Sequence, residues 1–165
     1  MDRLSEMVRR LADGDIEFVI VGGYAVVAYG ASLQTQDLDV CCRFSPESLR
    51  QLARVLSDVH PRHRMTLQKL PLEMTDELAS RMKNLYLDTD LCALDCLSEV
   101  AGIGGFEEVL RNSIEIAMPP GKCRVLTLEA LIRAKETMGR AHDKVAVLQL
   151  TAIREKLAPR SQPPP

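Results

Sequence analysis

The sequence predicts an α/β fold in which a mixed β-sheet is flanked by helices, with further helices at the C-terminus. Short apolar runs of strand length, such as residues 18–21 and 93–97, recur along the chain. They alternate with stretches whose hydrophobic residues repeat at helical spacing, such as residues 2–12. A length of 165 residues with 46% hydrophobic content suits a single domain, which we expect over residues 1–158. The proline-rich tail 159–165 is expected to be disordered.

The first half of the chain shows a clear start or stop signal for most of its elements. Asp13-Gly14-Asp15 ends the first helix, and Gly30 is a suitable C-cap for the second. Ser45-Pro46-Glu47 combines an N-cap, a proline at the first helical position and a first-turn acid. The expected elements are a helix over 2–12, a strand over 18–21, a helix over 24–29, a strand over 37–44 and a helix of about four turns ending near residue 59.

The second half of the chain is less regular at its start, over residues 60–84. The clearest signals are Pro119-Pro120-Gly121, which predicts a hairpin turn, and Thr127, which predicts a helix N-cap. The expected elements are a strand over 65–70, a helix over 75–82, strands over 85–87 and 93–97, a loop over 102–105, a helix over 106–112, hairpin strands over 114–117 and 123–126, and helices over 127–138 and 143–157.

Composition narrows the classes of protein. A net charge of −2 provides no global attraction to nucleic acid, although Arg62-His63-Arg64 forms a local basic cluster. No apolar run reaches the roughly 18 residues that a membrane-spanning helix needs, and no signal peptide is recognisable, so we expect a cytoplasmic protein without a membrane partner. The cysteines lie mostly in apolar strand-like runs without zinc-finger spacing, which favours buried reduced thiols.

The segment from Phe18 to Val40 carries the strongest functional signal. It reads as a strand, a Gly22-Gly23 turn, a short helix and a second strand that bears Asp37 and Asp39. Residues two apart on a strand share one face, with Cα atoms roughly 6.6 Å apart. Two carboxylates at that spacing repel each other unless a cation lies between them. The pattern therefore predicts a divalent-metal site near a phosphate.

The Gly-Gly turn followed by Thr35-x-Asp37-Leu38-Asp39 resembles the nucleotidyltransferase superfamily, which has the fold of DNA polymerase beta. The chain looks most like the minimal bacterial nucleotidyltransferases, including those of toxin–antitoxin systems. The run from Thr89 to Leu97 is similar to the strand that bears the third carboxylate of the family, which here is Asp95. Leu131-Ile132-Arg133-Ala134-Lys135 and the following Gly139 to Asp143 resemble its C-terminal helical segment.

This resemblance implies a site and a set of ligands. Asp37, Asp39 and Asp95 would be catalytic and would bind Mg²⁺ or Mn²⁺, with a nucleoside triphosphate as substrate. The nucleotide-binding residues implied by the resemblance are Gly22, Gly23, Ser32, Thr35, Lys135 and Arg140. Asp88 and Asp90 remain alternatives to Asp95, and the three aspartates could instead cap turns or lie at a solvated sheet edge. Thr35 could equally only shape the start of its strand.

Lys135 lies on the inward stripe of its predicted helix, together with hydrophobic residues. An inward lysine must reach solvent with its amine, pair with a carboxylate or contact a phosphate. The resemblance favours a phosphate-facing role. Asp143, in the first turn of the last predicted helix, is a candidate partner.

The chain departs from the family pattern at Leu33, where many relatives carry an arginine, and at Cys92, where a glycine is common. The leading hypothesis is a metal-dependent nucleotidyltransferase that moves a nucleoside monophosphate onto a hydroxyl of a tRNA, a protein or a small molecule, including the case of a toxin with an antitoxin partner. The alternative is a catalytically degenerate member that binds a nucleotide or a protein. A third interpretation is a structural α/β domain with incidental aspartates.

Overall fold

A computed structural model describes residues 1–119 and 121–158 of the chain. A seven-stranded mixed sheet forms its centre, with strand order β3-β4-β5-β2-β1-β9-β8. The strands are β1 (Phe18–Ile20), β2 (Asp37–Cys42), β3 (Arg62–His63), β4 (Asn84–Asp88), β5 (Ala93–Leu97), β8 (Ser113–Met118) and β9 (Gly121–Leu126). The helices are α1 (Arg3–Asp13), α2 (Gly23–Ala28), α3 (Pro46–Leu56), α4 (Asp76–Arg81), α5 (Phe106–Arg111), α6 (Leu128–Met138) and α7 (Ala141–Leu157). The α/β prediction is thereby confirmed.

The sheet is mixed because two parallel contacts interrupt a series of antiparallel ones. β2 pairs in parallel with β5, and β1 pairs in parallel with β9. The pairs β1–β2, β3–β4, β4–β5 and β8–β9 are antiparallel. The parallel β2–β5 pair lies in the middle of the sheet, and partly buried and buried residues alternate along Asp37–Val40 of β2 and along β5. Side chains of opposite faces therefore alternate along both strands.

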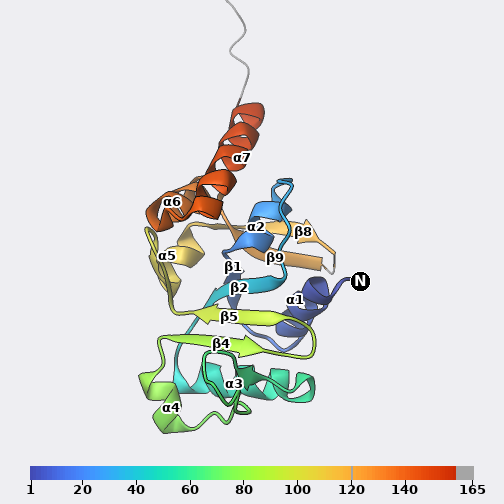
Figure 1. The fold of residues 1–165 in the computed structure, drawn as a ribbon, viewed down its shortest axis with the longest axis vertical. Helices are drawn as coiled ribbons and strands as arrows, with labels where there is room; N and C mark the ends of the chain where they lie inside the picture. The colour runs from blue at the N-terminus through green and yellow to red at the C-terminus, as the bar shows by residue number, and fades with distance from the viewer. Residues whose placement is uncertain (120, 159–165) are drawn as a thin grey trace, which may run out of the picture.

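Helices pack beside the sheet and flank it at both ends of the view (Figure 1). α3 and α4 lie beside β4 at one end of the view, and α6 and α7 lie together at the other. The core is formed by apolar side chains of α1, α3 and the sheet, among them Met7, Leu38, Leu49 and Leu94, which are all fully buried. Within the described ranges, no helix combines the length and apolar character needed to cross a membrane.

Local capping explains where several helices begin. The Ser45 hydroxyl accepts a hydrogen bond from the Ser48 backbone N–H at 3.1 Å, with Pro46 at the first helical position. The Thr127 hydroxyl accepts one from the Ala130 N–H at 3.2 Å. At the far end of α6, Gly139 adopts a left-handed conformation with φ of 64°, which ends the helix. These starts agree with the expected ones.

The strand expected over residues 37–44 ends at Cys42, and three further expectations differ from the structure. Residues 65–70 form turns and irregular chain instead of a strand, and the strand that pairs with β4 is the preceding Arg62–His63. Gly104–Gly105, expected within a loop, forms β7 and pairs with β6 (Glu99–Val100). The last helix begins at Ala141, two residues earlier than expected. The predicted disordered tail lies outside the described residues.

Candidate active site

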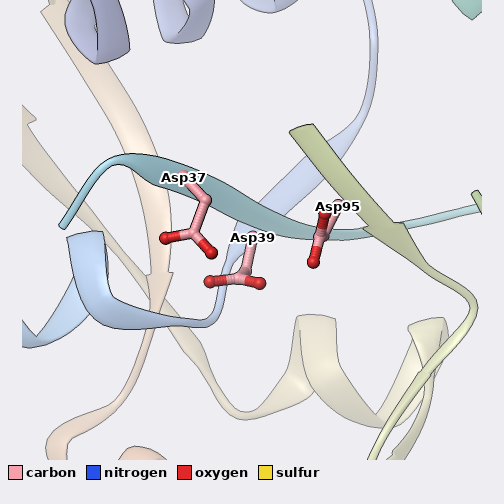
Figure 2. Close-up of side chains that lie close together, drawn as sticks. All are labelled: Asp37, Asp39 and Asp95. Carbon is pink, nitrogen blue, oxygen red and sulfur yellow. The ribbon is translucent and has the colours of Figure 1, made fainter. Parts of the chain in front are cut away.

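Three aspartates converge at the centre of the sheet (Figure 2). Asp37 and Asp39 lie two residues apart on β2, so their side chains share one face. Asp95 lies on β5 directly opposite Asp39 in the parallel ladder. One carboxylate oxygen from each residue lies within 4.8 Å of the others. The register of β2 against β5 thus brings together side chains that are more than 50 residues apart in sequence.

The two alternatives to Asp95 lie elsewhere. Asp88 forms an ion pair with Lys69 at 2.9 Å, and Asp90 contacts His60. Asp88 stands opposite Ala93 across the β4–β5 pair, at the end of the strand. Among the described residues, neither belongs to the group of carboxylates that could share a metal ion.

The Gly22-Gly23 turn lies against this cluster. Gly22 precedes α2, and a Cβ added to it would stand 1.8 Å from Asp39 Oδ2. A Cβ on Gly23 would meet Thr35 Oγ1 at 3.1 Å. The absence of side chains therefore allows the backbone of the turn to approach the carboxylates closely.

The two hydroxyl residues of the connecting loop have different positions. The Thr35 hydroxyl donates to the Asp37 carbonyl at 3.1 Å and lies 3.2 Å from Asp37 Oδ1, so it orients the first carboxylate. Ser32 is exposed, and its backbone N–H donates to Gln149 Oε1 of α7 at 3.0 Å. Within the described residues, no hydrogen bond joins the Ser32 hydroxyl to the cluster.

The electrostatics of the cluster favour a bound cation. Burial and the neighbouring charges of Asp37 and Asp95 raise the pKa of Asp39 to about 6. Lys135 and the Gly23 N–H act on Asp39 in the opposite direction. Burial also raises the pKa of Asp95, although Arg64 opposes this shift. A set of oxygen ligands that repel one another in this way fits a hard divalent cation such as Mg²⁺.

Arg64 lies at the cluster, although its sequence context does not mark it as a site residue. Its guanidinium pairs with Asp95, and both side chains are largely covered. Its Cζ lies 5.8 Å from the centre of the Tyr86 ring. The only signal in the sequence was its place in the basic cluster at residues 62–64, and nothing local linked it to Asp95, 31 residues further on.

Lys135 and Arg140 converge on one buried acid. Lys135 Nζ lies 3.2 Å from Asp143 Oδ1, and Arg140 Nε lies 2.6 Å from Asp143 Oδ2. The Asp143 side chain is completely buried, and that of Lys135 is 10% exposed. Burial acts to raise the pKa of Asp143, but the hydrogen bonds from Arg140 and Lys135 outweigh it and lower this pKa to about 2. Pairing with Asp143 was one of the alternatives that the sequence left open for Lys135, and the structure shows it.

The charges of the same two cations also act on the carboxylate cluster. The charge of Lys135 lowers the pKa of Asp39, and Asp39 in turn acts on Arg140. Because Arg140 is half exposed while Asp143 is buried, its guanidinium lies between the protein interior and solvent. The α6–α7 junction therefore borders the acidic cluster with positive charge.

The cysteines are free and mostly buried, as their sequence context predicts. All five are free, and all but Cys92 are buried. Burial raises the pKa of Cys41 to about 12 and that of Cys92 to about 11, so both thiols stay protonated near neutral pH. Leu33 and Cys92, the two departures from the family pattern, both line an open cavity of about 910 Å³ beside Thr35.

Comparison with known proteins identifies the fold. No protein-family model matches the sequence, and no curated protein matches it. Among solved structures, the lincosamide antibiotic adenylyltransferase LnuA with lincomycin bound superposes with a TM-score of 0.65 at 14% identity, covering 92% of this chain and 96% of that one.

Two further solved structures are similar to this chain in fold. A nucleotidyltransferase-like antigenic protein from Paracoccidioides brasiliensis gives a TM-score of 0.58 at 13% identity, covering 93% of this chain and 74% of that one. A candidate nucleotidyltransferase from Thermotoga maritima gives 0.54 at 16% identity, covering 90% of each chain. The chain has the nucleotidyltransferase fold, as its sequence predicts.

Proposed function

We propose that this chain, which has the nucleotidyltransferase fold, is a metal-dependent nucleotidyltransferase that moves a nucleoside monophosphate from a nucleoside triphosphate to an acceptor hydroxyl. One observation supports this more than any other: the carboxylates of Asp37, Asp39 and Asp95 converge beside the Gly22-Gly23 turn. A carboxylate cluster at a backbone turn can hold a metal ion and leave room for phosphate oxygens.

The three aspartates would hold Mg²⁺ or Mn²⁺ through their oxygens. When bound, the metal neutralises the phosphate charge and stabilises the attacking and leaving oxygens. In the reaction, the acceptor oxygen forms a bond to the α-phosphorus, the bond from that phosphorus to the bridging oxygen breaks, and pyrophosphate leaves. We assign Asp95 to the acceptor side, where it assists loss of the hydroxyl proton.

We assign the remaining site residues to the nucleotide. The Gly22 and Gly23 backbone, with Ser32 and Thr35, would border the phosphates. Lys135 and Arg140 would supply positive charge to the triphosphate from the α6–α7 junction. Both pair with Asp143, but Arg140 suits this role better because its side chain is half exposed, whereas that of Lys135 is almost buried.

For the acceptor, the structural likeness to LnuA favours a small molecule with a hydroxyl, since that protein is an adenylyltransferase of a lincosamide antibiotic. A tRNA end or a protein side chain remains an alternative acceptor. A toxin role with an antitoxin partner remains a prediction from the sequence resemblance.

A catalytically weak nucleotide-binding protein is the second candidate function. The Arg64–Asp95 ion pair favours it, because the third carboxylate is already engaged by a guanidinium. Leu33 in place of the arginine common in relatives points in the same direction. The two candidates differ in turnover, since both bind nucleotide.

Calorimetry with ATP, GTP, CTP and UTP, each with Mg²⁺ or Mn²⁺, tests the shared part of the proposal. We expect wild-type protein to bind at least one triphosphate in a metal-dependent way and Asp39→Ala to lose that binding. Asp90→Asn is the matched control, because Asp90 contacts His60 outside the cluster. Absence of binding with all four triphosphates would contradict the proposal.

Release of pyrophosphate in the presence of a panel of hydroxyl-bearing acceptors, antibiotics and tRNA included, then separates the two candidates. Pyrophosphate formed together with a nucleotidylated acceptor supports the transferase. Tight metal-dependent binding without turnover on any acceptor supports the catalytically weak alternative.

A further inference from the structure

The guanidinium of Arg64 is fixed from two sides against the face that carries the acidic cluster. Tyr86 on β4 stands directly opposite Asp95 on β5 in the antiparallel ladder, so both side chains project from the same face. Arg64 pairs with the carboxylate of Asp95, and its Cζ lies 5.8 Å from the centre of the Tyr86 ring. The Tyr86 ring and the Asp95 carboxylate therefore hold the Arg64 guanidinium between them.

The backbone also holds Arg64 in place. Its N–H donates to the Tyr86 carbonyl at 3.0 Å, which continues the pairing of β3 with β4 by one residue. Immediately afterwards the chain leaves the sheet, and Met65 and Leu67 are 75% and 104% exposed. Arg64 is thus the last anchored residue before an exposed turn. Its side chain is 26% exposed and that of Asp95 is 13% exposed, so solvent screens their attraction only in part.

The Asp95 carboxylate therefore has two possible partners that compete, a metal ion and the Arg64 guanidinium. Its oxygen belongs to the group of three that lies within metal-bridging distance, and its carboxylate already accepts from a guanidinium. Two cations close to the same carboxylate repel each other. A metal ion that engages all three aspartates must therefore displace Arg64 from Asp95 or share the carboxylate with it at a cost.

We propose that Arg64 is a positioning residue that competes with the divalent cation for Asp95 and so sets the metal affinity of the cluster. This inference rests on the proposed function, because it takes the three aspartates as metal ligands. In the metal-free protein, Arg64 neutralises Asp95 and keeps its carboxylate oriented toward the cluster. When the metal engages Asp95, the guanidinium leaves it, while the backbone anchor at Tyr86 remains.

Titration of the protein with Mn²⁺ alone, followed by electron paramagnetic resonance, tests the competition without any turnover. We expect Arg64→Gln to lower the Mn²⁺ dissociation constant about tenfold, which corresponds to about 1.4 kcal/mol. Arg64→Lys retains the charge and should stay close to wild type. Lys69→Gln is the matched control, because it removes a cation five residues away that pairs with Asp88 outside the cluster.

The Asp95→Asn background separates direct competition from a general effect of charge. If Arg64 acts through Asp95, adding Arg64→Gln to Asp95→Asn should change Mn²⁺ affinity less than twofold. If the gain persists in that background, Arg64 acts on Asp37 and Asp39 through space and the proposal is wrong. Equal affinity of wild type and Arg64→Gln would also overturn it.

Arginine side-chain NMR of the wild-type protein tests the proposal without requiring that any variant folds. Saturating Mg²⁺ should shift the Arg64 Nε–Hε resonance, whereas an unchanged resonance would contradict displacement. If wild type and Arg64→Gln both bind no Mn²⁺, the proposed function fails together with this inference. If wild type binds and the Arg64 measurements show no effect, only the inference fails.

Discussion

The carboxylate of Asp39 lies against the backbone of Gly22, so closely that a Cβ on Gly22 would stand 1.8 Å from Asp39 Oδ2. The same Cβ would stand 2.6 Å from Asp39 Cβ, so rotation of the carboxylate alone cannot relieve the contact. The turn and the acidic strand are therefore one packed unit. A side chain added at Gly22 must therefore displace Asp39.

Gly22→Ala should reduce metal-dependent nucleotide binding strongly, because the added methyl group forces Asp39 out of the cluster. Overpacking of this kind also destabilises a protein, typically by about 1–3 kcal/mol. Calorimetry with a triphosphate and Mg²⁺, together with thermal unfolding, measures both effects. Gly105→Ala is the control, since its nearest neighbour would be the Ser98 carbonyl at 4.0 Å. Wild-type binding by Gly22→Ala would contradict the close approach.

Asp39→Asn should stabilise the metal-free protein at neutral pH while removing metal binding. Burial raises the Asp39 pKa to about 6, so the folded state binds more protons than the unfolded state between about pH 4 and 6. Stability contributed by this residue therefore falls as pH rises through that window, by at most about 3 kcal/mol. Asparagine removes the charge that causes the loss.

Chemical denaturation in EDTA between pH 4.5 and 8 measures this effect. The stability advantage of Asp39→Asn should grow as pH rises to about 6 and then level off. Asp88→Asn, which removes a carboxylate paired with Lys69 outside the cluster, should show no such gain. A variant that is less stable than wild type at pH 7 would rule out the repulsion within the cluster.

Lys135→Met should lower stability, because it leaves the fully buried Asp143 with fewer partners. Breaking a buried ion pair typically costs about 3–5 kcal/mol, and we expect the lower end because Arg140 still donates to both oxygens of Asp143. Thermal and chemical unfolding measure the loss. Lys144→Met, at an exposed position of α7, is the control. Weaker nucleotide binding with an unchanged melting temperature would instead indicate that the Lys135 charge serves the phosphates alone.

Asp143 should contribute to acid denaturation. Its folded pKa is lowered to about 2 from an ordinary 3.8, so its contribution is fully present above about pH 4 and is lost as pH falls toward 2. The shift corresponds to about 2 kcal/mol. The stability difference between wild type and Asp143→Asn should therefore shrink over that range. The control is Glu155→Gln, which removes an exposed carboxylate from the same helix. Its stability difference from wild type should not change in this way with pH. A constant difference between pH 5 and 2 would contradict it.

Elements with strong local signals could be predicted from the sequence. The strand at Phe18, the Gly22-Gly23 turn and the β2 strand with its alternating aspartates follow from patterns within a few residues. Helix starts at Ser45 and Thr127 follow from single capping hydroxyls. These features are local because the hydrogen bonds and side-chain alternation that produce them join near neighbours in sequence.

The prediction of a strand over residues 65–70 was wrong because strand formation depends on a distant part of the chain. Its apolar residues satisfied the strand pattern, but a strand requires a partner, and β4 pairs with Arg62–His63 instead. Met65 and Leu67 consequently face solvent. The segment alone does not show whether it forms a paired strand or an exposed turn, since pairing depends on a strand some 20 residues away.

The identity of the third carboxylate and of its partner likewise depended on long-range pairing. Asp88, Asp90 and Asp95 look alike in sequence, and the parallel register that sets Asp95 against Asp39 selects one of them. The Arg64–Asp95 pair follows from two further strand pairings. Residue types and their alternation were enough to predict a candidate metal site on β2. Which distant charges complete it depends on sheet register, where a shift of one residue moves every side chain to the opposite face.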